Sequence, residues 1–404
     1  MCWAVSASAQ AELKRPSEIP LTAETAAQVA LDRSPALKAA RARARAEEAQ
    51  ARADGVPEDP KLVGDYKLGS GVGRTEVALT FDLWSLVGAG DRRRASGAES
   101  ERAEAALAED ALALSEDAKS AVYAVQAASA TLILRRENAS AARALLDLAE
   151  GQRRAGNIAQ LDLDEERAAA GETDLGADRA EADLAAARSR LARLMRVPVD
   201  SGWWTQAALE TPPKEIPEAS ALEALARSRR PARAAALAAA RAASERARAW
   251  TSASAGALRL GAAAEREPDG TRLAGPAFEL DLPVFDPSKP RLEAADARAA
   301  EAAANAEEEE ADLTAELESL RARLDAARRE AGLWRDEIVP ARAGITEQMQ
   351  LRYNGMLTGA AQLLAAREAE TDARLRLIEA LRDYWTTRAA LERAVGGSLP
   401  EGKS

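Results

Sequence analysis

Two short segments of the chain alternate apolar and polar residues, and they begin 199 residues apart. The first covers residues 79–84, which read LTFDLW, and the second covers residues 278–283, which read FELDLP. Alternation with a period of two predicts a β-strand with one apolar and one polar face. Each segment completes a predicted hairpin, over residues 61–84 and 257–285, with turn-forming residues between its strands.

Long stretches of Ala, Glu, Arg and Leu at helical spacing follow each hairpin, over residues 90–197 and 290–395. Gly156 in the first stretch matches Gly355 in the second at the same offset of 199 residues. Because the register is kept from strand to helix break, the pattern indicates an internally duplicated structural unit. The predicted organisation is an N-terminal tail over 1–20, a first repeat over 21–200, a linker over 201–217, a second repeat over 218–397 and a C-terminal tail over 398–404.

Local signals also predict where the shorter helices begin and end. Thr22 is a plausible N-cap for a helix that runs to about Ser34, and Pro35 then starts a second helix through about Asp54. Gly156 and Gly355 are interpreted as structural breaks that relax the long helices where neighbouring elements pack around them.

Composition favours long packed helices over ordinary compact domains. Of 404 residues, 30% are charged and only 3% are aromatic, and much of the apolar fraction is Ala and Leu. The net charge of −11 argues against a nucleic-acid partner. The chain has no histidine, one cysteine and no phosphate-binding loop, so we expect neither an enzyme nor a bound cofactor or metal.

The hairpins raise the question of a membrane. The sequence contains no run of 18 apolar residues, so it predicts no transmembrane helix. Each hairpin strand has about ten residues, however, which is enough to cross a bilayer as a tilted β-strand. Four strands cannot close a barrel, and open strand edges are not tolerated in lipid. If the strands span a membrane, several copies must therefore combine them, and three copies would supply twelve strands.

The N-terminus indicates export. Ala7, Ser8 and Ala9 form an A-x-A cleavage pattern before Gln10, which predicts the remnant of a secretory signal peptide. A lipidated Cys2 is the alternative, although no lipobox precedes it.

Four sets of segments share a recognisable pattern, and they are residues 21–31 with 34–37, residues 278–286, residues 352–355, and residues 380–392 with the closing glycines 396 and 397. In combination and in this order, these segments resemble the TolC-type outer-membrane efflux factors. The resemblance covers roughly residues 20–397, and the segments at the end of the chain are most similar to the heavy-metal (Cus/Czc-like) efflux branch.

The resemblance implies a mainly helical chain whose long antiparallel helices form a tunnel and whose four strands join a trimeric twelve-stranded barrel. It implies the exit duct of a tripartite efflux system in the outer membrane of a Gram-negative bacterium, with the tunnel in the periplasm. The implied partners are two further copies of the chain, a periplasmic adaptor and an inner-membrane pump of the RND type. Heavy-metal cations are the favoured substrate; drug efflux or type I secretion are the alternatives.

The polar strand positions are candidates for the pore lining. If the apolar faces of the strands lie in lipid, Asp82, Glu279 and Asp281 face the lumen, where acidic rings would favour cations. The alternative is a lumen face that is polar without being selective.

A second set of residues is predicted at the tips of the helix hairpins, as a gate or as an adaptor contact. The offset of 199 pairs the break near Glu137 and Asn138 with Asp336 and Glu337, and Pro340 suits a helix restart just beyond. The alternative is an ordinary solvated helix end. The candidates are Arg135, Arg136, Glu137, Asp336 and Glu337.

A different class of protein also fits the composition. A soluble coiled-coil scaffold with a small cap sheet would use the same helices, but it leaves the two-faced, register-matched hairpins unexplained.

Overall fold

The computed structural model describes residues 21–57, 59–69, 72–206, 208–253, 258–267, 269–280 and 288–399. The signal-like N-terminus and Asp281 lie outside these residues.

The first two helices begin and end where the sequence predicts. Helix α2 spans Ala23–Arg33, and the Thr22 side chain accepts a hydrogen bond from the Thr25 backbone N–H, while the Thr25 side chain accepts one from the Thr22 backbone N–H. This reciprocal cap satisfies two backbone donors at the helix start. Helix α3 spans Pro35–Asp54 and starts at the proline, whose fixed φ suits a first helical position.

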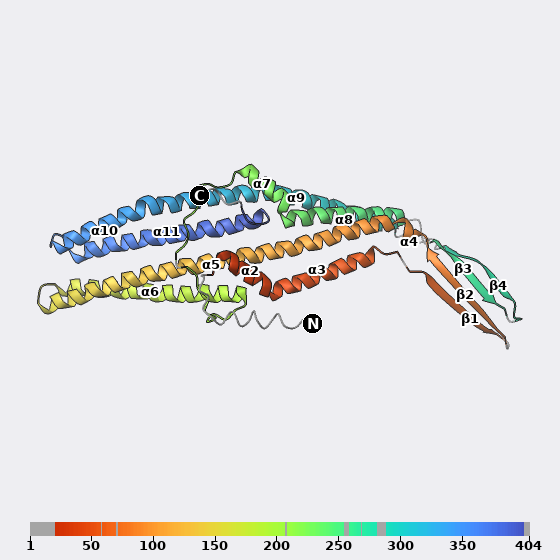
Figure 1. The fold of residues 1–404 in the computed structure, drawn as a ribbon, viewed down its shortest axis with the longest axis horizontal. Coiled ribbons are helices and arrows are strands. Elements are labelled where there is room, and N and C mark those ends of the chain that lie inside the picture. The colour runs from red at the N-terminus through yellow and green to blue at the C-terminus, as the bar shows by residue number, and fades with distance from the viewer. Residues whose placement is uncertain are drawn as a thin grey trace. The chain divides into compact units, whose positions relative to one another are not determined.

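The two predicted hairpins are present and form one sheet. Strands β1 (Lys61–Gly69) and β2 (Val72–Asp82) make the first hairpin, and β3 (Leu258–Arg266) and β4 (Arg272–Leu280) make the second. The strand order is β1-β2-β3-β4, and every neighbouring pair is antiparallel. Figure 1 shows the four strands side by side, so β1 and β4 are the two edges of the sheet.

Helices make up most of the remaining described chain. The short helix α4 (Trp84–Val87) follows β2, and the long helices α5 (Ala89–Arg154) and α6 (Gln160–Met195) complete the first half. The second half has α7 (Ala219–Arg229), α8 (Pro231–Ala253), α9 (Ser288–Leu333), a π-helical turn η1 (Trp334–Ile338), α10 (Val339–Asn354) and α11 (Ala360–Ala394). None of the helices in the described ranges is both long and apolar enough to span a membrane.

The predicted helix break at Glu137 and Asn138 is wrong. Helix α5 continues without interruption to Arg154, and Asn138 is buried against its neighbours inside that helix. Neither residue forces the backbone out of the helical region, because both have only moderately lower helix propensity than Ala. The chain reverses instead after Arg154, and α6 runs back antiparallel to α5, as ion pairs Arg143–Asp174 and Arg136–Glu181 show.

The predicted break at Asp336 and Glu337 is also wrong, although the helix is distorted there. The chain stays helical through Pro340, and the backbone N–H of Val339 donates to the carbonyl of Trp334, five residues back. Pro340 has no N–H, and its ring would clash with the carbonyl of Asp336 in a regular α-helix. The wider π-turn accommodates the proline without ending the helix.

The chain divides into two compact units, and each draws segments from both halves of the sequence. The first unit comprises residues 1–37, 111–229 and 314–404, and the second comprises residues 38–110 and 230–313. A core of small side chains around Val122, Leu191 and Met195 packs the first unit, together with the buried ring of Trp203. Ala is the commonest buried residue, which allows neighbouring helix backbones to approach closely.

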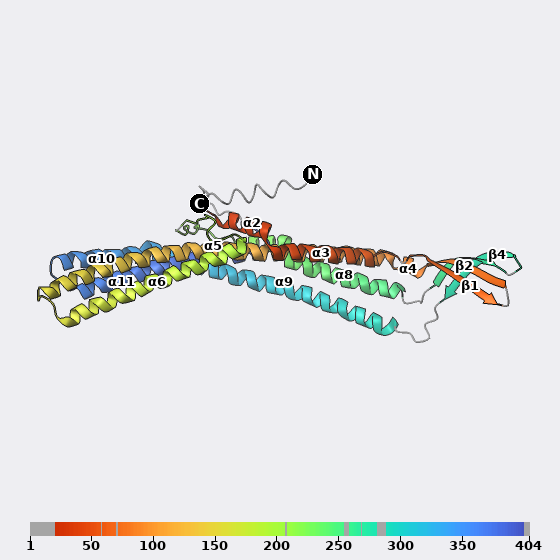
Figure 2. The same cartoon turned by 90° about the horizontal axis from the view of Figure 1, so that it is seen from below.

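In the second unit, ion pairs join the helices that lead to the sheet. Arg102 on α5 bonds to Glu47 on α3 at 2.7 Å, Arg94 on α5 bonds to Glu245 on α8 at 2.9 Å, and Arg230 at the start of α8 pairs with Glu309 on α9 at 2.9 Å. Figure 2 shows α3 and α8 leading toward the strands.

Candidate functional site

One face of the sheet is apolar and exposed. The register pairs Leu62 with Leu79, Leu79 with Ala262 and Leu260 with Phe278, so these side chains share a face. Phe278 is 79% exposed and Leu62 is 71% exposed. A contiguous apolar surface of this kind is unfavourable in water and marks contact with lipid or with another protein. Its larger members are Leu62, Tyr66, Val77, Leu79, Phe81, Leu260, Phe278 and Leu280.

The opposite face is polar, and its charges are mixed rather than acidic. Asp82 and Glu279 lie on it, as predicted, but Arg259 is the register partner of both. The Arg259 guanidinium bonds to the Glu279 carboxylate at 3.0 Å, and Arg74 pairs with Glu265 on the same face. The carboxylates of Asp82 and Glu279 therefore flank the positive charge of Arg259, which makes this face less acidic than the sequence predicts. Pairing of β2 with β3 creates this arrangement.

Gly261 permits a close approach between the two hairpins. It lies opposite Thr80, which is buried, and a Cβ at position 261 would lie 1.8 Å from the carbonyl oxygen of Leu79. No side chain fits in that space. Glycine inside a strand commonly marks such a close backbone approach. Gly275 on β4 lies on the same face, but a Cβ added there would have no other atom within 4 Å, so its side-chain space is open.

The predicted tip residues lie along helices and not at the turns. Arg136 bonds to Glu181 on α6 at 2.7 Å, and Arg135 lies beside Gly176. Glu137 lines a shallow pocket with Asn138, well inside α5. Asp336 and Glu337 lie in the π-turn, where both nitrogens of the Arg335 fork bond to Asp336 at 2.7 Å and lower the pKa of its carboxyl.

Gly156 and Gly355 are helix breaks, as predicted, but they lie in the turns that join antiparallel helices. After α5, the N–H of Asn157 bonds to the carbonyl of Gln152, and Gly156 has a φ of +78°. After α10, Leu357 bonds to Arg352 in the same way, but the left-handed residue is Met356, with a φ of +57°. Both turns are Schellman caps. The equivalent left-handed positions are therefore Gly156 and Met356.

The α10–α11 turn exposes large apolar side chains. Met356 is 93% exposed and Leu357 is 80% exposed, and Leu161, just after the α5–α6 turn, is also exposed. A left-handed conformation at a residue other than glycine is strained by about 1 kcal/mol, and such strain is a pointer to function. The side chains of Met356 and Leu357 are therefore largely open to solvent in this chain.

The two turns border a common cavity of about 420 Å³. Its lining includes Glu165 and Glu166 on α6, Tyr353 on α10 and Gln362 on α11. Glu166 is only 8% exposed, and burial, followed by repulsion from Glu165, raises the pKa of its carboxyl. Across the described residues, no cluster of three or more potential metal-binding side chains occurs.

The raised pKa of Glu166 predicts a pH-dependent stability. A carboxyl whose pKa is higher in the folded state takes up a proton on folding, so stability falls as pH rises from the ordinary Glu pKa through the folded value. Glu166→Gln is therefore expected to raise the thermal unfolding midpoint at pH 7.5 and to match the wild type near pH 4. The exposed Glu172→Gln on the same helix serves as control. An equal increase at both pH values would contradict this cause.

Comparison with known proteins supports the fold. No protein-family model matches the chain, and no curated protein matches it. Solved structures do match over almost the whole chain: a membrane protein from Pseudomonas aeruginosa is 21% identical, with a TM-score of 0.80, over 95% of this chain and 92% of the other.

Two further matches are described as channels. CusC, whose structures concern transmembrane channel formation, is 17% identical, with a TM-score of 0.78 over 94% of this chain and 93% of its own. The outer-membrane channel OprN is 20% identical, with a TM-score of 0.79 over 93% of this chain and 90% of its own. The TolC-like fold expected from the sequence is confirmed. The Cus-like branch is not singled out, because CusC is no more similar than the other two.

Proposed function

We propose that the chain is an outer-membrane exit duct of a tripartite efflux system in a Gram-negative bacterium. The observation that carries the proposal is the four-stranded sheet, which has one exposed apolar face, one charged face and two edges, β1 and β4, that have no partner among the described strands. The matching folds of solved outer-membrane channels support it. The duct performs no chemistry, and substrate passes through it while a separate pump supplies the energy.

The sheet edges favour a homotrimer. Lipid offers no hydrogen-bonding groups, so each unpaired edge must meet another strand. Three copies that join β1 of one chain to β4 of the next would close a barrel of twelve strands, with the apolar face toward lipid and the charged face toward the lumen. A barrel of one chain would have too few strands to close.

The substrate proposal is broader than the one that the sequence favours. The argument from the lumen for heavy-metal cations as the substrate depends on an acidic lining. In this sheet, however, Arg259 lies between Asp82 and Glu279. We therefore propose an exit duct whose substrate is chosen by the pump, with metal efflux, drug efflux and type I secretion as its three versions.

Removal of Arg259 tests the lumen assignment. In planar bilayers, Arg259→Gln is expected to raise cation over anion selectivity several-fold, because two carboxylates lose the guanidinium between them. Arg266→Gln, on the opposite face of the same strand, is expected to leave the reversal potential unchanged. Unchanged selectivity in Arg259→Gln channels would show that this face does not line the conducting path.

The helix turns are the proposed docking site for the periplasmic adaptor, in place of the predicted residues along α5 and η1. The combined variant Met356→Ser and Leu357→Asp is expected to reduce co-purification of the adaptor at least tenfold while membrane insertion is kept. Ile345→Asp, an exposed apolar position further back on α10, is the control. Undiminished adaptor capture would place the docking site elsewhere.

A further inference from the structure

The cavity of about 420 Å³ that the two helix turns border is lined by three acidic side chains and by no basic one. Asp162, Glu165 and Glu166 come from the start of α6, and their spacing of three and four residues places them on one face of that helix. Among the described residues that line the cavity, none is a lysine or an arginine. The cavity is therefore an acidic site without a positive charge of its own.

Glu166 is buried in this cavity without a partner. It is only 8% exposed, and within the described part of the chain its carboxylate makes no hydrogen bond or ion pair. Burial, followed by repulsion from Glu165, raises the pKa of the Glu166 carboxyl, whereas a nearby cation would lower it. Asp162 accepts a hydrogen bond from the Ala159 backbone N–H at 3.0 Å, which leaves its second oxygen free. Buried carboxylates are normally paired, so the cavity lacks a cation that its side chains would accept.

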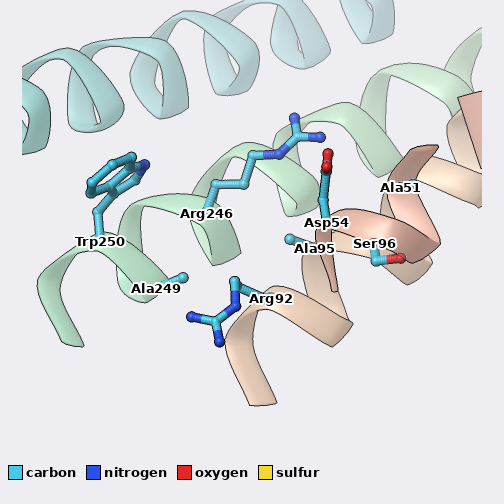
Figure 3. A pocket seen from close by; sticks show the side chains of 8 residues that line it. All are labelled: Ala51, Asp54, Arg92, Ala95, Ser96, Arg246, Ala249 and Trp250. Atoms are coloured by element: carbon cyan, nitrogen blue, oxygen red, sulfur yellow. The ribbon is translucent and has the colours of Figure 1, made fainter. Parts of the chain in front are cut away.

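Two other polar cavities in the described chain contain both signs of charge. In the cavity near the strands, the Arg246 guanidinium lies toward Asp54, as Figure 3 shows, and it also pairs with Glu99 at 3.4 Å. In the cavity around Asn138, Arg374 pairs with Glu370. The cavity between the turns differs from both because no side chain in its lining offsets the three carboxylates.

The size and the remaining lining favour an organic cation over a bare metal ion. The described residues hold no group of three side chains that could bind a metal, and the volume lies in the range of small-molecule sites. Ala149, Ile158 and Ala361 offer apolar contacts to methylene groups. Tyr353 supplies a hydroxyl and an aromatic ring, and both attract an ammonium group.

The spacing of the carboxylates favours a ligand with two positive charges. Asp162 and Glu166 are four residues apart on α6, and the Cβ atoms of such a pair are about 5–6 Å apart. A short aliphatic chain separates two terminal amines by a similar distance. Glu166 is buried whereas Asp162 is exposed, so one ammonium group would lie deep in the cavity and the other near its entrance.

We propose that this cavity binds a small aliphatic diamine, with one ammonium group at Glu165 and Glu166 and the other at Asp162. The methylene chain lies against Ile158, and Tyr353 on α10 contacts the buried ammonium group. The bound diamine thereby links the α5–α6 hairpin to the α10–α11 hairpin at their turns. This binding goes beyond the proposed function and does not depend on it, because every residue of the site belongs to the first unit.

The test is isothermal titration calorimetry of the purified full-length chain with 1,4-diaminobutane, in an amine-free buffer at pH 7.5. The wild type is expected to bind one diamine per chain, and Glu165→Gln with Glu166→Gln is expected to bind it at least tenfold more weakly. The matched control is Glu172→Gln with Asp178→Asn, which removes two carboxylates from the same helix outside the cavity and is expected to bind like the wild type. The diamine should also raise the thermal unfolding midpoint of the wild type and of the control, but not that of the cavity variant.

Three further ligands identify what the cavity accepts. Butylamine, with one ammonium group, is expected to bind several-fold more weakly than the diamine, and magnesium at the same concentration is expected not to compete. No binding of the diamine, an equal loss in the control variant, or competition by magnesium would overturn the site. Binding of N-acetyl-lysine amide as tightly as the diamine would overturn the diamine in favour of a lysine from a partner protein. None of these outcomes bears on the proposed function, whose readouts are membrane location and assembly.

Discussion

Gly261→Ala is expected to prevent the sheet from assembling. The new Cβ would overlap the carbonyl of Leu79, so β2 and β3 would have to separate where the two hairpins join. Overpacking of a well-filled site typically costs about 1–3 kcal/mol, and a contact with a rigid backbone belongs at or above the upper end of that range. The membrane-extracted assembly should be absent or should dissociate at a much lower temperature than the wild type.

Gly275→Ala is the matched control for this prediction. Gly275 lies on the same face, in the neighbouring strand, and a Cβ there has open space. The expected change in the dissociation temperature is close to zero. If Gly261→Ala assembles as well as Gly275→Ala, the pairing of the first hairpin with the second is not the one described.

Phe278→Arg is expected to reduce insertion into the outer membrane. Phe278 is the most exposed large side chain on the apolar face of the sheet, but it lies two residues from the end of β4, so an arginine that faces lipid there costs less than the about 2–4 kcal/mol of the bilayer midplane. The loss is multiplied in an assembly of several copies. The amount of protein in the outer-membrane fraction is the measurement.

The control for Phe278→Arg is its neighbour on the other face. Ala277 points to the charged side of the sheet, so Ala277→Arg is expected to insert normally. In a soluble scaffold, Phe278→Arg would instead improve the solubility of the protein, because the apolar side chain at position 278 would be exposed to water. Normal insertion of Phe278→Arg would therefore contradict a lipid-facing apolar surface.

Local patterns were sufficient to predict the elements of the fold. The period-two alternation locates both hairpins, and the N-cap at Thr22 and the proline at position 35 locate the ends of the first helices. These signals are local because each depends on the conformation of only a few neighbouring residues. The matching offset of Gly156 and Gly355 likewise identifies the two helix breaks, although the offset alone does not show that the chain reverses there.

The positions of the helix tips were not predicted, because polar pairs such as Glu137 and Asn138 do not end a helix. At both helix turns a residue just after the helix enters the left-handed region, and after α10 that residue is Met356, which sequence preferences would not select. Pro340 is a misleading signal for a different reason: a π-turn absorbs it within the helix.

The charged face of the sheet shows why candidate sites need the pairing of strands. Arg259 occupies a polar position in the period-two alternation of its strand, so its place on the polar face is predictable from the sequence. Its place between Asp82 and Glu279 depends on how β3 pairs with strands on both sides. The burial of Glu166 likewise cannot be predicted from the sequence around it, because the α10–α11 hairpin supplies part of the cavity that surrounds this residue.

The most direct test of the central claim is the location and mass of the full-length protein, expressed with an intact export signal. Membranes are fractionated, and the detergent extract is analysed by size-exclusion chromatography with light scattering. The proposed duct predicts outer-membrane protein with the mass of three 42.7 kDa chains. A soluble species of one chain would contradict the barrel and would favour a coiled-coil scaffold.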